Sequence, residues 1–512
     1  MPPKGGKLPG MRNLPALAAI AFGLAACSTT ASQRPPFDAA EDPGGEAAAR
    51  YYLGRIALLD DDDKGPRLNA VIVTNANAPA EARAAAAAGL PLGGRTVLVK
   101  DNVETRELPT TAGSLALAGN ATGRDAPLIA RMRAAGGVVL GKTNLSEWAN
   151  IRSSRSSSGW SAVGGQTRNP HGEGRNPCGS SSGSGAAIAA GLAWAAIGTE
   201  TDGSITCPAS VNGIVGFKPT VGLVSRTHVV PISHSQDTAG PMARSVADAA
   251  LLLNAIAGSD PADAVTREAD AREVDYTAGL ASASLGGVRI GVMRKQVGGD
   301  PAVERLFNAA LAGLARVGAE LVPIEHEPPD AMGEAEFAVL LYELREDLAA
   351  YLASSPADIP VRDLDDVIAF NAAHAVDELR WFGQDIFEQA AKPADREAYD
   401  KARADSRRLA GPEGIDRLLA ENGVAFLIAP TTGPAWLTDL VLGDHYEGSI
   451  GAGSLAAIAG YPHLSVPMGA VEGLPVGLSI IGARWSDAAV LHAGAAYERA
   501  RSVPLAVPDL AK

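Results

Sequence analysis

Residues 177–205 read PCGSSSGSGAAIAAGLAWAAIGTETDGSI, and this stretch decides the fold. It holds two serine-bearing loops, around Ser180 and Ser204, separated by an alanine-rich block and an apolar run that ends at Ile197. A helix of about ten residues advances roughly 15 Å, and a return strand of about five residues retraces roughly 16 Å. The pattern therefore predicts that both serine loops meet at one edge of a β-sheet. A flexible Gly/Ser linker is the alternative for 179–185, but that segment runs directly into helix-forming alanines.

A base is needed near these serines, because a serine hydroxyl is a poor nucleophile until its proton is removed. No histidine lies within twenty residues of Ser204, and the nearest are His171 and His228. Lys100 is the other candidate, since it closes the run 96–99, which reads as a buried strand. A free lysine has a pKa of about 10.4, so Lys100 must be desolvated to act as a base. Ser180 would then relay protons between Lys100 and Ser204. A lone lysine that snorkels at a strand end is the alternative.

The stretch from about residue 92 to residue 242 resembles the amidase signature family throughout. The matching motifs lie at 100–102, 110–114, 141–148, 179–181, 203–205, 216–220 and 237–242, and a weaker match resumes near 429–431 and over 460–482. The resemblance implies an α/β fold, with one large amidase-signature domain over residues 46–508 and a mixed β-sheet core sandwiched by α-helices.

The resemblance also implies the chemistry, which is hydrolysis of a carboxamide to carboxylate and ammonia through an acyl-enzyme, by a Ser-cisSer-Lys triad. The resemblance implies that Lys100 is the base, Ser180 the bridging acid/base and Ser204 the acyl-forming nucleophile. The loop before Ser204 carries Gly203, which has no Cβ, so the backbone is free to turn and aim its N–H groups inward. The oxyanion-hole candidates are the backbone N–H groups of Thr201, Asp202, Gly203 and Ser204. No cofactor and no metal are expected.

Asp202 departs from the commonest family pattern, which has glycine at this position. A carboxylate beside the oxyanion loop is expected to shape the substrate site, or else to cap its own turn. The sequence Glu-Thr-Asp-Gly-Ser-Ile-Thr-Cys at residues 200–207 most resembles that of the branch that contains bacterial peptide amidases. We therefore expect a peptide amide or a similar small acyl amide as substrate.

Three further motifs are present, but their neighbouring residues argue against the functions that the motifs suggest. Residues 136–143 match the P-loop pattern, but their interior is Val-Val-Leu and reads as a strand. Residues 179–183 match the Gly-x-Ser-x-Gly elbow, which must follow a strand, whereas turn-forming residues precede them here. Residues 60–64 resemble a protease tag site and are better explained as an acidic loop.

The N-terminus resembles a bacterial lipoprotein signal. Basic residues precede an apolar run over 14–26 that is too short to span a membrane, and the run ends in Leu-Ala-Ala before Cys27. We expect a signal peptide over 1–26, lipidation of Cys27 and a flexible tether over 27–45. Ser28 indicates sorting to the outer membrane of a Gram-negative envelope, with membrane contact by the lipid anchor only. The alternative is a cytoplasmic enzyme with an unprocessed hydrophobic tail.

Composition narrows the remaining function classes. The net charge is −14 with no basic stripe, which argues against nucleic-acid binding. Cys178 and Cys207 flank the two serine loops and could approach each other, but sequence alone does not establish a disulfide. No His-x-x-x-His or Cys-x-x-Cys spacing indicates a metal site.

The segment 330–420 is charged and helical in pattern, so we expect it to cover the sheet. The resemblance to the amidase signature family implies that this segment also helps define the acyl pocket. Trp160, Trp381 and Trp436 are candidate pocket walls, with a plain core position as the commoner role of an aromatic side chain. Two other functions stay open: a glutamine-dependent amidotransferase-type subunit that passes ammonia to a partner, and a non-catalytic amide-binding lipoprotein. The oligomeric state is not predicted.

Overall fold

The computed structural model describes residues 42–60, 66–446 and 448–510. The expected signal peptide over 1–26, the lipidation site Cys27 and most of the acidic loop at 60–64 lie outside the described residues. Residues 42–45, expected to end the tether, instead join the fold: Asp42 is buried and accepts a hydrogen bond from the Tyr52 hydroxyl at 2.6 Å. Within these described ranges, no helix combines the length and the apolar character that a transmembrane span requires.

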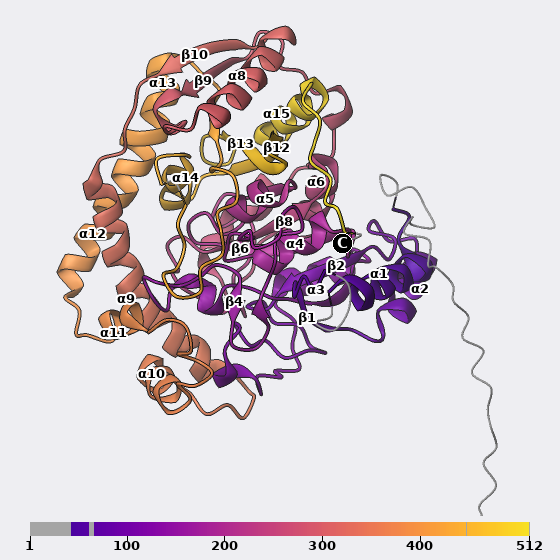
Figure 1. The fold of residues 1–512 in the computed structure, drawn as a ribbon, viewed down its shortest axis with the longest axis vertical. Coiled ribbons are helices and arrows are strands. Elements are labelled where there is room, and N and C mark those ends of the chain that lie inside the picture. The colour runs from indigo at the N-terminus through magenta and orange to yellow at the C-terminus, as the bar shows by residue number, and fades with distance from the viewer. Residues whose placement is uncertain (1–41, 61–65, 447, 511–512) are drawn as a thin grey trace, which may run out of the picture. The chain divides into compact units, whose positions relative to one another are not determined.

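An 11-stranded mixed β-sheet organises the described part of the chain, in the order β1-β3-β2-β6-β8-β7-β12-β13-β11-β9-β10 (Figure 1). Strand β2 pairs in parallel with both β3 and β6, whereas β6 pairs antiparallel with β8. The strands are β1 (Val71–Thr74), β2 (Thr96–Lys100), β3 (Val138–Thr143), β6 (Ala195–Glu200), β7 (Val215–Lys218), β8 (Thr238–Ala243), β9 (Arg289–Met293), β10 (Glu320–Ile324), β11 (Phe426–Pro430), β12 (His463–Val471) and β13 (Leu474–Ile481), with a separate ribbon of β4 (Trp160–Ser161) and β5 (Gly165–Gln166).

Helices cover both faces of this sheet, because alternate side chains of each strand point to opposite faces. Val97 and Val99 of β2 pack in one apolar cluster, while Leu98 between them packs in another. The first cluster includes side chains of α3 (Pro127–Ala134), α6 (Val246–Ile256), α8 (Pro301–Arg316) and α15 (Asp487–Ala500). The second includes side chains of α1 (Gly45–Leu59), α2 (Ala78–Ala87), α4 (Ser182–Ala189) and α5 (Thr206–Asn212). The predicted fold, a mixed sheet between layers of helices in one large domain, is confirmed.

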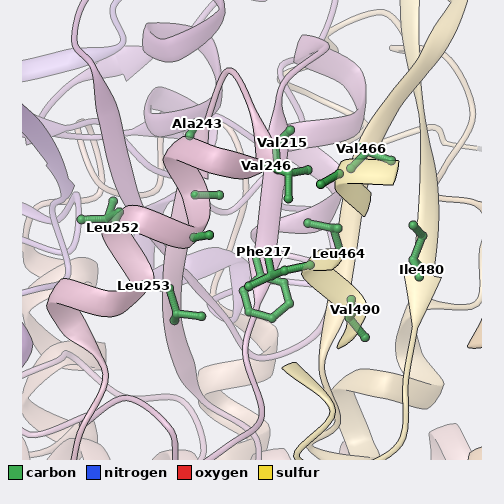
Figure 2. Close-up of a cluster of buried hydrophobic side chains, with 14 of the residues drawn as sticks. Val215, Phe217, Ala243, Val246, Leu252, Leu253, Leu464, Val466, Ile480 and Val490 are labelled. Atoms are coloured by element: carbon green, nitrogen blue, oxygen red, sulfur yellow. The ribbon is translucent and has the colours of Figure 1, made fainter. Parts of the chain in front are cut away.

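The first cluster forms the core between β7, α6 and β12. Figure 2 shows Phe217 of β7 and Leu464 of β12 side by side, with Leu253 of α6 nearby. All three side chains are 0% exposed. Full burial of one such side chain stabilises the fold by about 1.5–3 kcal/mol, so this cluster fixes the sheet on which the site stands.

The remaining helices include those of the segment 330–420. Side chains of α9 (Asp330–Ser354), α10 (Leu364–Ala373) and α11 (Asp385–Ala390) pack together in a third cluster. The other helices are α7 (Ala269–Arg272), α12 (Arg396–Ala410), α13 (Arg417–Asn422) and α14 (Gly453–Ala459). The helical pattern predicted for 330–420 is therefore confirmed. Helices α9, α10, α11 and α12 lie along one edge of the fold in Figure 1.

The decisive stretch folds as a helix and a strand, with shifted boundaries. The strand begins at Ala195 and continues past Ile197, the end of the apolar run, to Glu200. Thr199 and Glu200 therefore belong to β6 and not to the following loop. The shift has a physical reason: β6 is a central strand, hydrogen-bonded to β8 over its whole length. The segment 138–143 is β3, as expected from its apolar interior.

Candidate active site

Lys100 ends β2 and lies at the centre of a small polar network. Its side chain is 0% exposed. The Nζ atom donates hydrogen bonds to Ser180 Oγ at 2.8 Å, to Thr199 Oγ1 at 2.8 Å and to the Thr199 carbonyl at 3.2 Å. The lysine therefore points inward to the first serine loop, and it does not snorkel to solvent.

The surroundings of Lys100 change its protonation. Burial lowers the pKa of its ammonium group to about 7, and the negative charges of Asp237 and Glu200 oppose this fall. Desolvation disfavours the charged form of a lysine, whereas nearby carboxylates favour it. A lysine with a pKa near neutral pH is able both to accept and to donate a proton under physiological conditions.

The loop of Ser180 is held by close backbone packing. The Gly179–Ser180 peptide bond is cis. A Cβ at Gly179 would lie 2.1 Å from Ser146 Oγ, so any larger residue would displace the Ser146 side chain. The Ser146 backbone N–H donates to the Ser180 carbonyl at 3.0 Å. These contacts fix the backbone of Ser180 while its hydroxyl faces Lys100.

Ser204 lies next to this loop. The Ser181 backbone N–H donates to the Ser204 carbonyl at 3.1 Å, which joins the two serine loops directly. The structure gives the Ser204 hydroxyl no hydrogen-bond partner among the described residues, and the residue lines a cavity. Gly203 has a φ of 77°, and a Cβ there would meet nothing within 4 Å. The turn thus leaves open space beside Ser204.

Two carboxylates hold this turn. Glu200 Oε2 accepts hydrogen bonds from the backbone N–H groups of Ile205 at 2.7 Å and Thr206 at 2.9 Å. Asp237 Oδ1 accepts one from Thr201 Oγ1 at 2.6 Å. Glu200 and Asp237 thus anchor the two ends of the turn 201–204.

A disulfide connects the two serine loops covalently. Cys178, two residues before Ser180, is bonded to Cys207, three residues after Ser204. The sequence alone leaves this pairing open, because the separation of the two cysteines in space depends on α4 and β6. The bond is one of the features that brings the loops of Ser180 and Ser204 together.

The cavity beside Ser204 has a volume of about 370 Å³. Residues 201–204 and the two disulfide cysteines line it, and the segment 431–454 contributes Trp436, Tyr446 and Ile450. From the predicted cover, Leu340 of α9 reaches it. Of the three candidate tryptophans, only Trp436 is among the lining residues.

The other two candidate tryptophans lie elsewhere. Trp160 packs against Phe382 in an edge-to-face contact with ring centroids 5.2 Å apart. Trp381 lies beside Arg380, whose guanidinium carbon is 4.9 Å from its ring centroid. Neither residue lines the cavity beside Ser204, so neither is a wall of the candidate site.

Asp202 adds negative charge to this cavity. Its Oδ2 accepts a hydrogen bond from Ser454 Oγ at 2.7 Å, and burial raises its pKa to about 6. Glu336 of α9 lies close enough to interact with it: burial and the charge of Asp202 raise the pKa of Glu336 to about 8. Gln236 Nε2 donates to Glu336 at 2.8 Å. The charge of Asp202 thus favours the neutral form of Glu336.

A group with metal-ligand spacing is formed by one residue of the loop before Asp237 and two residues of α9. One ligand atom each of His234, Glu343 and Asp347 lies within 4.8 Å of the others. The oxygens of Glu343 already accept hydrogen bonds, including those from Tyr399 at 2.6 Å and from Ser235 Oγ at 2.5 Å. These bonds explain the group as a clamp between α9 and the loop that carries Asp237.

The sequence motifs identify Lys100, Ser180 and Ser204 but not their supporting residues. Thr199 and Asn102 are such residues, since Asn102 Nδ2 donates to Thr199 Oγ1 at 2.9 Å. Asn102 stands in the motif at 100–102, so its motif position was a usable signal, whereas Thr199 has no local signature.

Comparisons with known proteins agree with this geometry. The Amidase family model matches residues 47–491. A probable amidase of Arabidopsis thaliana is 38% identical over 467 residues, covering 88% of this chain and 85% of the relative. A glutamyl-tRNA(Gln) amidotransferase subunit of Acidothermus cellulolyticus is 36% identical over 494 residues, covering 90% of this chain and 92% of the relative.

Solved structures show the same relation. The native peptide amidase of Stenotrophomonas maltophilia is 48% identical with a TM-score of 0.86, covering 93% of this chain and 97% of the other. A complex of the peptide amidase PAM with the competitive inhibitor chymostatin is 49% identical with a TM-score of 0.86, covering 92% of this chain and 97% of the other. The chain therefore belongs to the amidase signature family, whose members are hydrolases that act on amide C–N bonds.

Proposed function

We propose that the protein removes ammonia from peptide amides, with Ser204 as the nucleophile. The observation that carries this proposal is the buried contact between Lys100 and Ser180, next to Ser204 at the cavity. A base whose pKa is about 7, beside a serine, is what activation of a hydroxyl nucleophile requires.

In the acylation step, neutral Lys100 takes the Ser180 proton while Ser180 takes the Ser204 proton. Ser204 Oγ attacks the amide carbon, and the carbonyl oxygen becomes an oxyanion held by the N–H groups of 201–204. The same proton returns through Ser180 to the amide nitrogen, the C–N bond breaks, and ammonia leaves. Such preorganised donors are typically worth about 10²–10³ in kcat each.

In the deacylation step, a water molecule takes the place of ammonia. Ser180 and Lys100 remove one proton from this water as it attacks the acyl carbon. The tetrahedral intermediate then collapses, the bond to Ser204 breaks, and the proton returns to Ser204 Oγ. The carboxylic acid product leaves and the three side chains regain their starting protonation.

Support for peptide amides comes from the solved relatives and from the cavity. The structures of peptide amidase are 48–49% identical to this chain, and one of them binds chymostatin as a competitive inhibitor. The cavity of about 370 Å³ lies in the range of small-molecule sites and is lined by apolar Trp436, Ile450 and Leu340 as well as polar groups. Asp202 lines the cavity and favours substrates that carry a positive charge near the scissile amide.

A glutamine-dependent function is the second candidate, favoured by the 36% identity to a glutamyl-tRNA(Gln) amidotransferase subunit. A non-catalytic amide-binding protein is the third. Against the third stands the complete set of Lys100, Ser180 and Ser204, which binding alone does not need.

We further propose that the enzyme is an envelope lipoprotein anchored through Cys27. The Cys178–Cys207 disulfide supports this location, because such bonds persist in oxidising compartments. Cells grown with labelled palmitate should label the wild-type protein and not the Cys27→Ala variant. Absence of label from both proteins contradicts the proposal.

The function itself is tested with a soluble form that begins at Ser28. Ammonia release is measured with peptide amides, aliphatic and aromatic amides, and glutamine. We expect peptide amides to be the best substrates. Turnover of small aliphatic amides only would refute the peptide assignment, and turnover of glutamine only would favour the second candidate.

A further inference from the structure

A cavity of about 10 Å³ lies beside the catalytic lysine's partner Thr199. Asn102 lines it from the same side, and Asp237 lines it as well. This volume is enough for one water molecule, provided that polar groups surround it. The small cavity is therefore a candidate site for a single water-sized ligand.

Its walls place it between two larger cavities. It shares Thr201 and Ile232 with the active-site cavity. It shares Val229 and Asp237 with an outer cavity of about 460 Å³. A molecule in the small cavity thus lies between the active-site cavity and the outer cavity.

The Asn102 side chain has an unsatisfied hydrogen-bond acceptor at this cavity. Its side chain is 3% exposed, and its Oδ1 atom is buried without a hydrogen-bond partner, although its Nδ2 donates to Thr199. A buried acceptor left unsatisfied is costly, so such atoms usually face a bound water. The ligand at this place must donate a hydrogen bond.

The Thr199 hydroxyl offers the complementary group. Its Oγ1 accepts hydrogen bonds from Lys100 Nζ at 2.8 Å and from Asn102 Nδ2 at 2.9 Å. A hydroxyl oxygen has two acceptor positions and one hydrogen. With both acceptor positions used, the hydrogen of Thr199 is left to donate to a further acceptor, such as a water molecule in the cavity.

Asp237 lines the small cavity and supplies a carboxylate that can accept a proton. Its Oδ2 accepts from the N–H groups of Ile232 at 2.8 Å and Ser233 at 2.9 Å, while its Oδ1 accepts only from Thr201. Burial raises the pKa of Asp237 to about 6, close to the value of about 7 for Lys100.

Glu200, the other carboxylate whose charge acts on Lys100, is not placed to accept a proton from this cavity. Its Oε2 accepts hydrogen bonds from the backbone of Ile205 and Thr206, and Glu200 is not among the lining residues of the small cavity. Arg226 lines the cavity but is paired with Asp263 at 2.7 Å.

We propose that the small cavity binds one water molecule that links Thr199 to Asp237, and so gives Lys100 a proton route to the outer cavity. The proposal rests on the catalytic role of Lys100 proposed above. The proton leaves Nζ for Thr199 Oγ1, the Thr199 hydrogen passes to the water, and a water hydrogen passes to the Asp237 carboxylate. Lys100 ends as a neutral amine, and Asp237 passes its new proton to solvent. The lysine is thereby readied for catalysis while substrate fills the front of the site.

The first test is a crystal structure of the wild-type enzyme, grown without ammonium salts. We expect density for one water within hydrogen-bond distance of Asn102 Oδ1 and Thr199 Oγ1. Ammonia, the reaction product, has the same size and donor groups, so density that appears only after ammonium is added assigns the site to the product. A cavity without density in both crystals refutes the water site.

The second test fills the cavity without changing a polar group. Val229→Leu adds one methylene to the wall, and Val471→Leu makes the same change in β12, where the residue lines none of these three cavities. Val229→Ile, which adds the same methylene but keeps the β-branched shape, replaces Val229→Leu if the change of shape impairs folding. The crystal structure of the variant should lack the water.

Proton transfer is then measured by a rapid pH jump. Enzyme at pH 5, where Lys100 is protonated, is mixed with buffer at pH 8 after a peptide amide has filled the site. We expect a lag before ammonia release that is at least about tenfold longer in Val229→Leu than in the wild type and Val471→Leu. Equal lags, with the water absent from the variant, overturn the proton route. Failure of the wild type to release ammonia at all refutes the proposed function instead, while the crystallographic result on the water still stands.

Discussion

The Cys178–Cys207 disulfide is expected to contribute both stability and activity. It closes a loop whose ends are 29 residues apart in sequence. In the chain-entropy model, a cross-link over a loop of this length stabilises the fold by about 3.6 kcal/mol at 25 °C. The double variant Cys178→Ala, Cys207→Ala should lose about this much free energy of unfolding.

The bond also affects catalysis, because Cys178 and Cys207 line the cavity and flank the loops of Ser180 and Ser204. The hydrogen bond from Ser181 to Ser204 remains in the variant, so the loops stay near each other but less precisely placed. Small displacements of reacting groups cost up to about 100-fold in rate. We expect kcat for a peptide amide to fall between about 10- and 100-fold.

Urea unfolding followed by circular dichroism measures the first effect, and ammonia release measures the second. The matched control is the wild-type enzyme with and without a reducing agent: reduction should reproduce the loss, and should leave the double variant unchanged. A double variant within about 1 kcal/mol of the oxidised wild type, with full activity, would refute this reasoning.

Three further outcomes are expected. Ammonia assays should show that Ser204→Ala abolishes turnover, Lys100→Ala nearly abolishes it, and Ser180→Ala leaves a small residual rate; equal rates for any of the three and the wild type contradict its role. Because Lys100 must be neutral to accept a proton, kcat/KM should fall about tenfold per pH unit below pH 7. Asp237→Asn removes a charge that raises the pKa of Lys100, so the pH at which kcat/KM begins to fall should be lower in this variant. If that pH is unchanged or higher, Lys100 is not the base whose pKa sets the profile. Asp202→Asn should lower the kcat/KM ratio between arginine-amide and leucine-amide peptides about fivefold, roughly 1 kcal/mol; an unchanged ratio removes Asp202 from substrate selection.

The two serines and the lysine could be located from sequence because each stands in a short local pattern. Ser180 precedes an alanine-rich helix, Ser204 follows a strand and a glycine turn, and Lys100 closes an apolar run. Helix and strand lengths were enough to predict that the two serine loops meet. The resemblance to a family supplied the roles.

The residues that support this trio could not be found in the same way. Thr199 and Asn102 are 97 residues apart in sequence, and their hydrogen bond exists only because β2 and β6 are neighbours in the sheet. Asp237 meets Thr201 across 36 residues for a similar reason, since β8 pairs with β6. Contacts of this kind depend on strand order, which hydropathy patterns do not give.

The pocket walls show a second limit. The segment 330–420 was expected to define the acyl pocket, and its helices do form, but Leu340 is its contribution to the lining. Trp436 and Tyr446 come instead from the segment between β11 and α14. That segment has no helical or strand periodicity, so its path over the site is set by tertiary packing.

The most direct test of the central claim is ammonia release from a C-terminal peptide amide by the soluble enzyme and its Ser204→Ala variant. We predict steady release by the wild type and none above background by the folded variant. Equal release by the two proteins would show that Ser204 is not the nucleophile. No release by the folded wild type from any amide in the panel would contradict the proposed activity itself.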